Sequence, residues 1–246
     1  MSRRTRLILY LLGICVAATV ILARELEPAF DKLAIERVQY LAQARQEFKN
    51  RWLGVGVIQY PSDLITYANL LYKVKPEVVI ESGTNYGGLS VFFSTVMENI
   101  NPSAKIVTVD IDSSKWDQEV AAGRITPKML ERIVFVKGDS VSTAVIDRIR
   151  ELTQGKRGLV LLDSLHTSEH VLKELELYSP FVSPGSYIIV NDTHLEMMKF
   201  MDMGSGPLRA VKDFLKENKE FTIDPDLPGT IISCAPSGFL RRIDNN

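Results

Sequence analysis

The sequence is poor in cysteine and carries almost no net charge. Its two cysteines, Cys15 and Cys234, lie in an amino-terminal apolar run and in a late strand-like segment, so an intrachain disulfide is not expected. Cysteine usage therefore indicates no oxidising compartment. The formal net charge is −1, whereas domains that bind nucleic acid usually carry a concentrated basic surface. We therefore expect no nucleic-acid partner.

Several motifs that would assign other chemistry are missing as well. The glycine-rich segments match neither the P-loop pattern, which ends in Gly-Lys-Ser/Thr, nor the dinucleotide pattern G-x-G-x-x-G. The zinc pattern H-E-x-x-H does not occur, and neither does the H-x-D that usually opens the iron site of an oxygenase. Internal repeats and low-complexity segments are also absent. A length of 246 residues suits one sizeable α/β domain with an appendage.

The amino terminus contains a long apolar run. Residues Leu7 to Ala23 carry no charge, three arginines precede them and Arg24 closes the run. Such a run just reaches across a thin hydrocarbon core, with the arginines at either end. We expect residues 1–24 to form a single-pass membrane anchor, with a cleaved signal peptide as the alternative. Residues 25–51 are expected to form an amphipathic helical linker. The side of the membrane that the following domain faces stays open.

Residues 52–246 alternate between strand-like and helical patterns, which predicts a doubly wound α/β domain with a mostly parallel sheet of seven strands. The last two strands are joined by the short segment from Asp224 to Gly229 and should pair antiparallel. The expected strands are Glu77 to Glu81, Lys105 to Asp110, Ile133 to Val136, Leu159 to Asp163, Ser186 to Val190, Glu220 to Ile223 and Thr230 to Cys234. The expected helices are Asp63 to Tyr72, Leu89 to Asn99, Ser142 to Thr153, Ser168 to Tyr178 and Pro207 to Asn218.

The segment from Val78 to Ser90 joins an apolar strand to a glycine-rich turn through Glu81. Ligands of open α/β sheets bind at this end of a strand, and glycines allow the backbone to approach a ligand closely before a helix begins. The pattern E-x-G-T-x-x-G-G resembles the first motif of S-adenosylmethionine-dependent methyltransferases. The residues expected to bind the cofactor here are Glu81, Gly83, Thr84, Asn85 and Gly87.

Two further strands are followed by acids. Asp110 ends the next strand, where an acid accepts hydrogen bonds from ribose hydroxyls in doubly wound folds. Asp112 is the alternative candidate for the acid that binds the ribose, although it could instead cap a helix or lie in a solvated turn. Asp139 follows the third strand and is expected on the adenine side of the cofactor, although it could instead cap the helix that starts at Ser142. Three consecutive strands that end in acids favour a nucleoside cofactor.

The fourth and fifth strands also end in oxygen-bearing side chains, those of Asp163, Asn191 and Asp192. Carboxylate and amide oxygens suit Mg²⁺ or another hard divalent cation better than Zn²⁺. Such an ion could bind substrate oxygens and lower the pKa of an attacking hydroxyl. The alternative is structural, with Asp163 as a helix cap and Asn191 and Asp192 in an Asx turn.

All three histidines follow these strands. His166 is the first candidate for the group that takes a substrate proton, because an unperturbed imidazole titrates near neutral pH. His194 is the second candidate for the group that takes this proton. Asp163 is also expected to be a catalytic group. His170 is interpreted as a packing or surface residue.

Motifs spread from Trp52 to Ile243 carry a wider resemblance. They are Trp52-Leu53-Gly54, Pro61-Ser62-Asp63-Leu64, Glu81 to Gly88, Gly138-Asp139-Ser140, Leu162-Asp163-Ser164, His170-Val171-Leu172, Gly206-Pro207, Phe214-Leu215 and Gly238 to Ile243. In these motifs the domain resembles the cephalosporin hydroxylase and rhamnosyl O-methyltransferase family. This resemblance implies a class I methyltransferase-like fold, cofactor contacts at Glu81, Gly83 and Asp110, and a divalent metal at Asp163, Asn191 and Asp192. The chain departs from the family where a Glu-Asp pair is more usual than Asn191-Asp192, and where the serine after the glycine pair is displaced to Ser90.

The resemblance implies an S-adenosylmethionine-dependent, metal-assisted O-methyltransferase that acts on a hydroxyl of a sugar, glycolipid or secondary metabolite. Two alternatives stay open, a hydroxylase-type member of the same family and a membrane protein that binds the cofactor without turnover. The expected partners are a small-molecule or glycolipid acceptor and, through residues 7–23, a membrane. Association into a homo-oligomer stays open.

The anchor gives a first testable prediction. Because the run at residues 7–23 is long and uncharged enough to cross a bilayer, carbonate-washed membranes should retain the full-length protein. Deletion of residues 1–24 should release a soluble domain that still binds S-adenosylmethionine. Full-length protein in the carbonate supernatant would contradict an anchor, and a shortened chain would indicate a cleaved signal.

Overall fold

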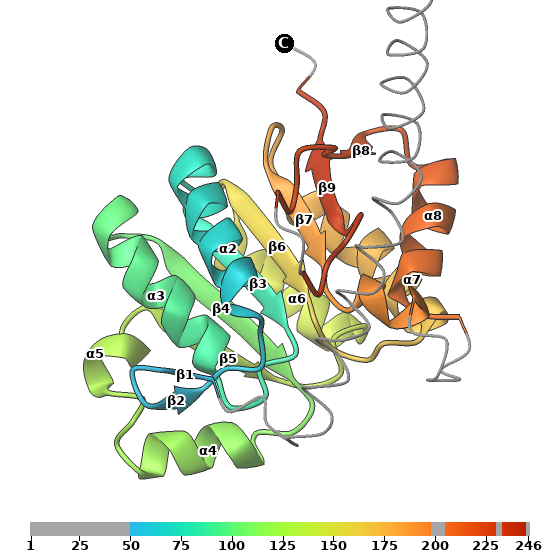
Figure 1. Cartoon of the computed structure of the whole chain (residues 1–246). Coiled ribbons are helices and arrows are strands. Elements are labelled where there is room, and N and C mark those ends of the chain that lie inside the picture. Colours follow the sequence, from blue (N-terminus) through green and yellow to red (C-terminus); the bar gives the residue numbers. More distant parts are fainter. Residues whose placement is uncertain (1–49, 198–204, 230–232, 245–246) are drawn as a thin grey trace, which may run out of the picture. The chain divides into compact units, whose positions relative to one another are not determined.

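The computed structural model describes residues 50–197, 205–229 and 233–244 (Figure 1). The expected anchor at residues 1–24 lies outside these ranges, as does the expected linker up to residue 49. Within the described ranges, no helix is both long and apolar enough to cross a membrane.

A seven-stranded sheet forms the centre of the domain, with the strand order β5-β4-β3-β6-β7-β9-β8. Strands β5, β4, β3, β6 and β7 run parallel, and β9 lies antiparallel between β7 and β8. The arrangement confirms the predicted mostly parallel sheet with an antiparallel last hairpin. The strands are β3 (Val78–Ser82), β4 (Lys105–Asp110), β5 (Ile133–Lys137), β6 (Gly158–Leu162), β7 (Tyr187–Val190), β8 (Phe221–Ile223) and β9 (Phe239–Arg242).

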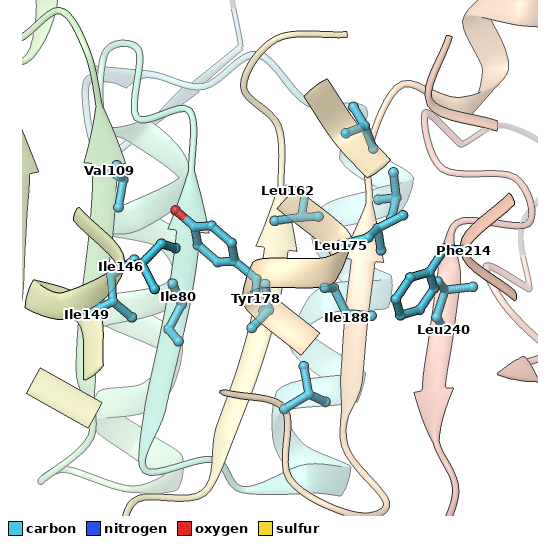
Figure 2. Close-up of a cluster of buried hydrophobic side chains, with 14 of the residues drawn as sticks. Ile80, Val109, Ile146, Ile149, Leu162, Leu175, Tyr178, Ile188, Phe214 and Leu240 are labelled. Carbon is cyan, nitrogen blue, oxygen red and sulfur yellow. The ribbon is translucent and has the colours of Figure 1, made fainter. Parts of the chain in front are cut away.

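Helices cover both faces of this sheet, as the long apolar strands require. Alternate strand residues such as Ile80, Leu162 and Ile188 pack against α6, α7 and α8, and Tyr178 of α7 lies over the centre of that face (Figure 2). On the opposite face, Tyr67 of α2 contacts Phe239 of β9, with 6.2 Å between ring centroids. The long helices are α2 (Pro61–Val74), α3 (Gly88–Ile100), α6 (Thr143–Thr153), α7 (Ser168–Tyr178) and α8 (Pro207–Glu217).

Several short elements that the sequence patterns did not predict lie between the long ones. A small hairpin pairs β1 (Arg51–Trp52) with β2 (Val55–Gly56). Trp116 is buried and stacks on Phe135, so one aromatic contact fastens α4 to β5. The other short elements are α4 (Ser114–Ala121), α5 (Pro127–Leu130) and the 3₁₀ turns η1 (Ser179–Phe181) and η2 (Thr193–Met197).

The predicted last strand, Thr230 to Cys234, was wrong: the last strand of the sheet is β9, Phe239–Arg242. Residues 230–232 lie outside the described ranges, and Cys234 belongs to no strand. Its backbone N–H donates to Asp63 Oδ2 at 2.8 Å and not to a neighbouring strand. The arginine pair of β9 concealed it in the sequence, because only Phe239 and Leu240 are buried there.

The order of the strands creates a switch point between β3 and β6. From β3 the chain runs outward to β4 and β5, and then returns to pair β6 with the other side of β3. Loops that leave neighbouring carboxyl ends in opposite directions open a crevice at such a point, where ligands of doubly wound folds bind. The acids predicted from the sequence follow β3 to β7 at this same edge.

The packing of helices on both faces of the sheet makes a prediction about stability. Ile149 of α6 is 0% exposed under the sheet, so replacement with alanine should lower the free energy of unfolding by about 2–5 kcal/mol. Ile65 of α2 is 64% exposed, and the same replacement there should change it by less than about 0.5 kcal/mol. Urea unfolding followed by tryptophan fluorescence measures both. Equal losses in the two variants would contradict the described packing.

Candidate active site

The glycine-rich turn after β3 is closely packed against its neighbours. Gly83 has φ +89°, and a Cβ there would lie 2.0 Å from the backbone oxygen of Asp163. Gly87 has φ +84°, and a Cβ there would lie 2.5 Å from the ring of Trp116. Both positions are therefore restricted to glycine. The turn that is expected to bind the cofactor is thus packed against the backbone of Asp163, one of the residues expected to bind the metal.

Glu81 lies beneath this turn, with almost no exposed surface. Its Oε2 accepts hydrogen bonds from the hydroxyls of Ser90 and Thr108, the latter at 2.7 Å. Burial raises the pKa of Glu81 to about 8, although these two hydroxyls oppose the shift. Thr84 is also buried and shares a 2.6 Å hydrogen bond with Thr108. Glu81 and Thr84 were both predicted to bind the cofactor. In this structure their side chains contact the protein interior and support the glycine-rich turn.

Asp110 ends β4 at the same edge of the sheet, is partly exposed and is hydrogen-bonded to the glycine-rich turn. Its Oδ2 accepts the backbone N–H of Asn85 at 2.9 Å, and Asn85 has φ +52°. Its Oδ1 accepts the N–H of Asp112 at 3.0 Å. Each oxygen keeps a lone pair that a ribose hydroxyl could use. The structure therefore brings Asp110, Asn85 and the glycines together, as the sequence predicted.

Asp112 and Asp139, the other two acids considered for the cofactor, accept hydrogen bonds within local turns. Asp112 accepts the backbone N–H of Ser114 at 2.9 Å and its hydroxyl at 2.7 Å, at the start of α4. Asp139 accepts the N–H of Val141 at 3.1 Å, and its side chain is exposed. The cap of α6 is provided by Ser142, which accepts the N–H of Val145. Asp139 is thus not the helix cap, and its carboxylate is open to a ligand.

Asp163, His166 and Asp192 converge after β6 and β7. Their ligand atoms all lie within 4.8 Å of one another. His166 Nε2 is 3.1 Å from Asp192 Oδ2 and 3.6 Å from Asp163 Oδ1. This nitrogen is buried, and no partner is aligned for a hydrogen bond with it. Asp192 adopts a left-handed backbone, φ +58°, which aspartate tolerates better than most residues.

Two members of the cluster, Asp163 and His166, have shifted pKa values. Burial raises the pKa of Asp163 above its usual range, and His166 opposes that shift. Burial lowers the pKa of His166, but Asp163 and Asp192 outweigh it and leave the pKa above the ordinary value for imidazole. The cluster therefore combines a surplus of negative charge with an imidazole that binds a proton readily.

Asn191 and His194 lie beside this cluster and are also bonded to other groups. The amide oxygen of Asn191 accepts the hydroxyl of Tyr67 at 2.8 Å, and the Asn191 side chain opposes the rise in the pKa of Asp163. His194 is buried; its Nδ1 donates to the backbone oxygen of Cys234 at 2.9 Å and lies 3.7 Å from Asp192 Oδ1. Of the three predicted metal ligands, Asp163 and Asp192 belong to the cluster, and the oxygen of Asn191 is engaged by Tyr67 of α2.

A divalent cation fits the donor set of the cluster. Two carboxylates supply hard oxygen ligands, and the unaligned Nε2 of His166 is a third potential ligand or a base beside them. A set of one imidazole and two carboxylates differs from the oxygenase triad of two histidines and one carboxylate. The donors suit Mg²⁺ or, with the imidazole included, Mn²⁺.

A second histidine, His170, was expected to be a packing or surface residue, but it contacts two serines that follow different strands. His170 Nε2 lies 3.0 Å from Ser140 Oγ and 3.2 Å from Ser164 Oγ. Ser164 also donates to the buried Glu174 at 2.7 Å. The i,i+4 spacing of His170 and Glu174 on a helix was the one available signal. The loop after β5 is therefore joined to the loop after β6.

Further residues at the back of the cluster were missed. Gln59 donates from Nε2 to Asp163 Oδ2 at 2.8 Å, and Cys234 donates its thiol to Gln59 Oε1 at 3.3 Å. Burial raises the pKa of this thiol, so it stays protonated. A lone polar residue inside the apolar run from Val57 to Tyr60 was the only sequence signal for Gln59.

Comparison with known proteins identifies the family of this chain. The family model Rhamnosyl O-methyltransferase/CmcI matches residues 44–243. The rhamnosyl O-methyltransferase of Mycobacterium tuberculosis H37Rv is 31% identical over 199 residues, which cover 79% of this chain and 78% of that protein. The rhamnosyl O-methyltransferase of Mycobacterium leprae is 31% identical over 169 residues, which cover 68% and 70%.

Solved structures show the same fold. A structure of CmcI with Mg and SAM is similar with a TM-score of 0.61 and 17% identity, over 80% of this chain and 78% of that one. CalS11, a TDP-rhamnose 3'-O-methyltransferase, is similar with a TM-score of 0.51 and 22% identity, over 74% and 78%. The described fold and the match over residues 44–243 agree. The chain is therefore a methyltransferase that belongs to the rhamnosyl O-methyltransferase/CmcI family.

Proposed function

We propose that this protein transfers a methyl group from S-adenosylmethionine to a hydroxyl of a sugar, with the help of a divalent cation. The observation that carries the proposal is that Asp110 and the glycine turn lie at the same carboxyl edge of the sheet as Asp163, His166 and Asp192. Relatives at 31% identity are named rhamnosyl O-methyltransferases, which supports a sugar as the acceptor.

The cofactor half would bind and orient S-adenosylmethionine, which supplies an electrophilic methyl group. Asp110 accepts ribose hydroxyls with the lone pairs that Asn85 and Asp112 leave free. The exposed carboxylate of Asp139 faces the adenine side. Glu81 and Thr84 hold the turn in place through Thr108, so the backbone at Gly83 can lie close to the cofactor.

The acceptor half would hold the hydroxyl in line with the methyl group and remove its proton. A divalent cation, when bound, lowers the pKa of a coordinated hydroxyl. Asp163 and Asp192 would hold that cation, and Asn191 would reach it only if its amide turned away from Tyr67. His166 would receive the proton at Nε2, which is directed toward both carboxylates. Positioning of the two reactants supplies the remainder of the rate enhancement.

The amino-terminal run suggests where the acceptor is found. If residues 7–23 anchor the chain in a membrane, a glycolipid hydroxyl becomes the most accessible sugar acceptor. Extracted glycolipids are therefore the first acceptors to test with labelled cofactor and purified protein. Transfer of label identifies the acceptor, and cofactor binding without transfer to any sugar would favour a binding protein instead.

Cofactor binding through Asp110 can be measured by calorimetry. Asp110→Ala should weaken S-adenosylmethionine binding by about 1.5–3 kcal/mol for each charge-assisted hydrogen bond lost. Asp110→Asn keeps one acceptor oxygen, so its affinity for S-adenosylmethionine should lie between those of Asp110→Ala and the native protein. Asp112→Ala is the matched control, because its carboxylate serves the start of α4. A loss of affinity in the control alone would show that the ribose acid is Asp112.

Dependence on a cation is the second prediction for this site. EDTA should abolish methyl transfer, and Asp163→Ala should do the same while cofactor affinity stays nearly intact. His166→Ala should retain Mn²⁺ binding but slow turnover by about 10²-fold to 10⁴-fold if His166 is the base.

Two results would change this assignment. Loss of Mn²⁺ binding in His166→Ala would make His166 a ligand and not the base. Full activity after EDTA treatment and in Asp163→Ala would eliminate the cation from the mechanism.

A further inference from the structure

Gln59 is a buried amide that contacts the central acid of the acceptor half directly. It lies in the segment between β2 and α2 and is only 4% exposed. Its Nε2 donates to Asp163 Oδ2 at 2.8 Å. The other carboxylate oxygen, Oδ1, is the one that lies 3.6 Å from His166 Nε2. The two oxygens of Asp163 therefore have different partners.

The orientation of the Gln59 amide is fixed by neighbours that can each donate one proton. The hydroxyl of Tyr67 is 2.8 Å from Asn191 Oδ1 and 3.2 Å from Gln59 Oε1. The thiol of Cys234 is 3.3 Å from Gln59 Oε1 and 3.5 Å from Asn191 Oδ1. The shorter contacts assign the hydroxyl to Asn191 and the thiol to Gln59.

This assignment gives each amide oxygen one donor and leaves the Gln59 NH₂ group directed at Asp163. A flipped amide would place N–H groups against the thiol and hydroxyl protons and present an oxygen to a carboxylate. Both changes replace attraction with repulsion in a buried place, where an unsatisfied polar group costs about 1–3 kcal/mol. The donor toward Asp163 is thus a defined part of the site.

We propose that Gln59 is a positioning residue that occupies Asp163 Oδ2 and thereby presents Oδ1 alone to a divalent cation. The inference rests on the proposed cation site at Asp163 and Asp192. Residues that orient a metal ligand from behind determine how well that ligand binds, and their loss typically weakens metal affinity by about 10-fold to 100-fold. Gln59 itself touches neither the cation nor the acceptor.

Titration of the full-length protein with Mn²⁺ tests the inference. Gln59→Met keeps the length of the side chain but removes the donor, and Gln59→Asn keeps a buried amide but withdraws it from Asp163. Both variants should bind Mn²⁺ about 10-fold to 100-fold more weakly than the native protein. Their affinity for S-adenosylmethionine without metal should stay within about 2-fold, because Asp110 and the glycine turn do not contact Gln59.

Thr66→Val is the matched control. Thr66 is buried on α2, and its hydroxyl bonds the backbone oxygens of Ser62 and Pro228, away from Asp163. This isosteric change should lower the melting temperature and leave Mn²⁺ affinity unchanged. If the Gln59 variants bind Mn²⁺ as tightly as Thr66→Val does, the inference is overturned and Gln59 only supports the fold.

The same titration separates this inference from the proposed function. A native protein that transfers methyl groups without binding Mn²⁺ would eliminate both the cation and the inference about Gln59. A native protein that binds Mn²⁺ but transfers no methyl group would overturn the proposed function, while weaker Mn²⁺ binding in the Gln59 variants would still support the inference.

Discussion

Burial of the parallel strands on both faces is the constraint from which the site follows. Strands β3 and β6 are buried at every position, and the helices that cover them leave no polar face. Polar side chains can therefore meet water only where these strands end. Because the strands are parallel, those ends share one edge, and the switch between β3 and β6 opens it. The cofactor half and the acceptor half are neighbours for this reason.

At that edge, the surroundings of each acid decide what it can do. Glu81 is enclosed with two hydroxyls and supports the turn, whereas Asp110 keeps free lone pairs at the surface. Asp163 has one oxygen held by Gln59 and the other directed to His166. Three acids at the ends of neighbouring strands thus differ in the protons and ligands that they accept. The difference comes from their burial and from their hydrogen-bond partners together.

Local patterns predicted the regular elements well. Strand β4 and helix α7 begin and end at the predicted residues, because apolar periodicity is a local signal. The carboxyl-edge acids also followed from the fold class. Strand β9 was missed because its arginines interrupt the apolar pattern, and Gln59 because its partner Asp163 lies 104 residues away. Contacts of that kind depend on tertiary packing, which one sequence does not encode locally.

The contact between Gly83 and Asp163 limits how this scaffold can be redesigned. A Cβ at position 83 would lie 2.0 Å from the Asp163 carbonyl oxygen, so no other residue fits without moving β3 or β6. The distance between the glycine-rich turn and the Asp163 backbone is therefore not adjustable by side-chain choice at that position. Directed evolution toward a new acceptor should leave Gly83 unchanged and vary exposed residues of the loop after β6, such as Leu165.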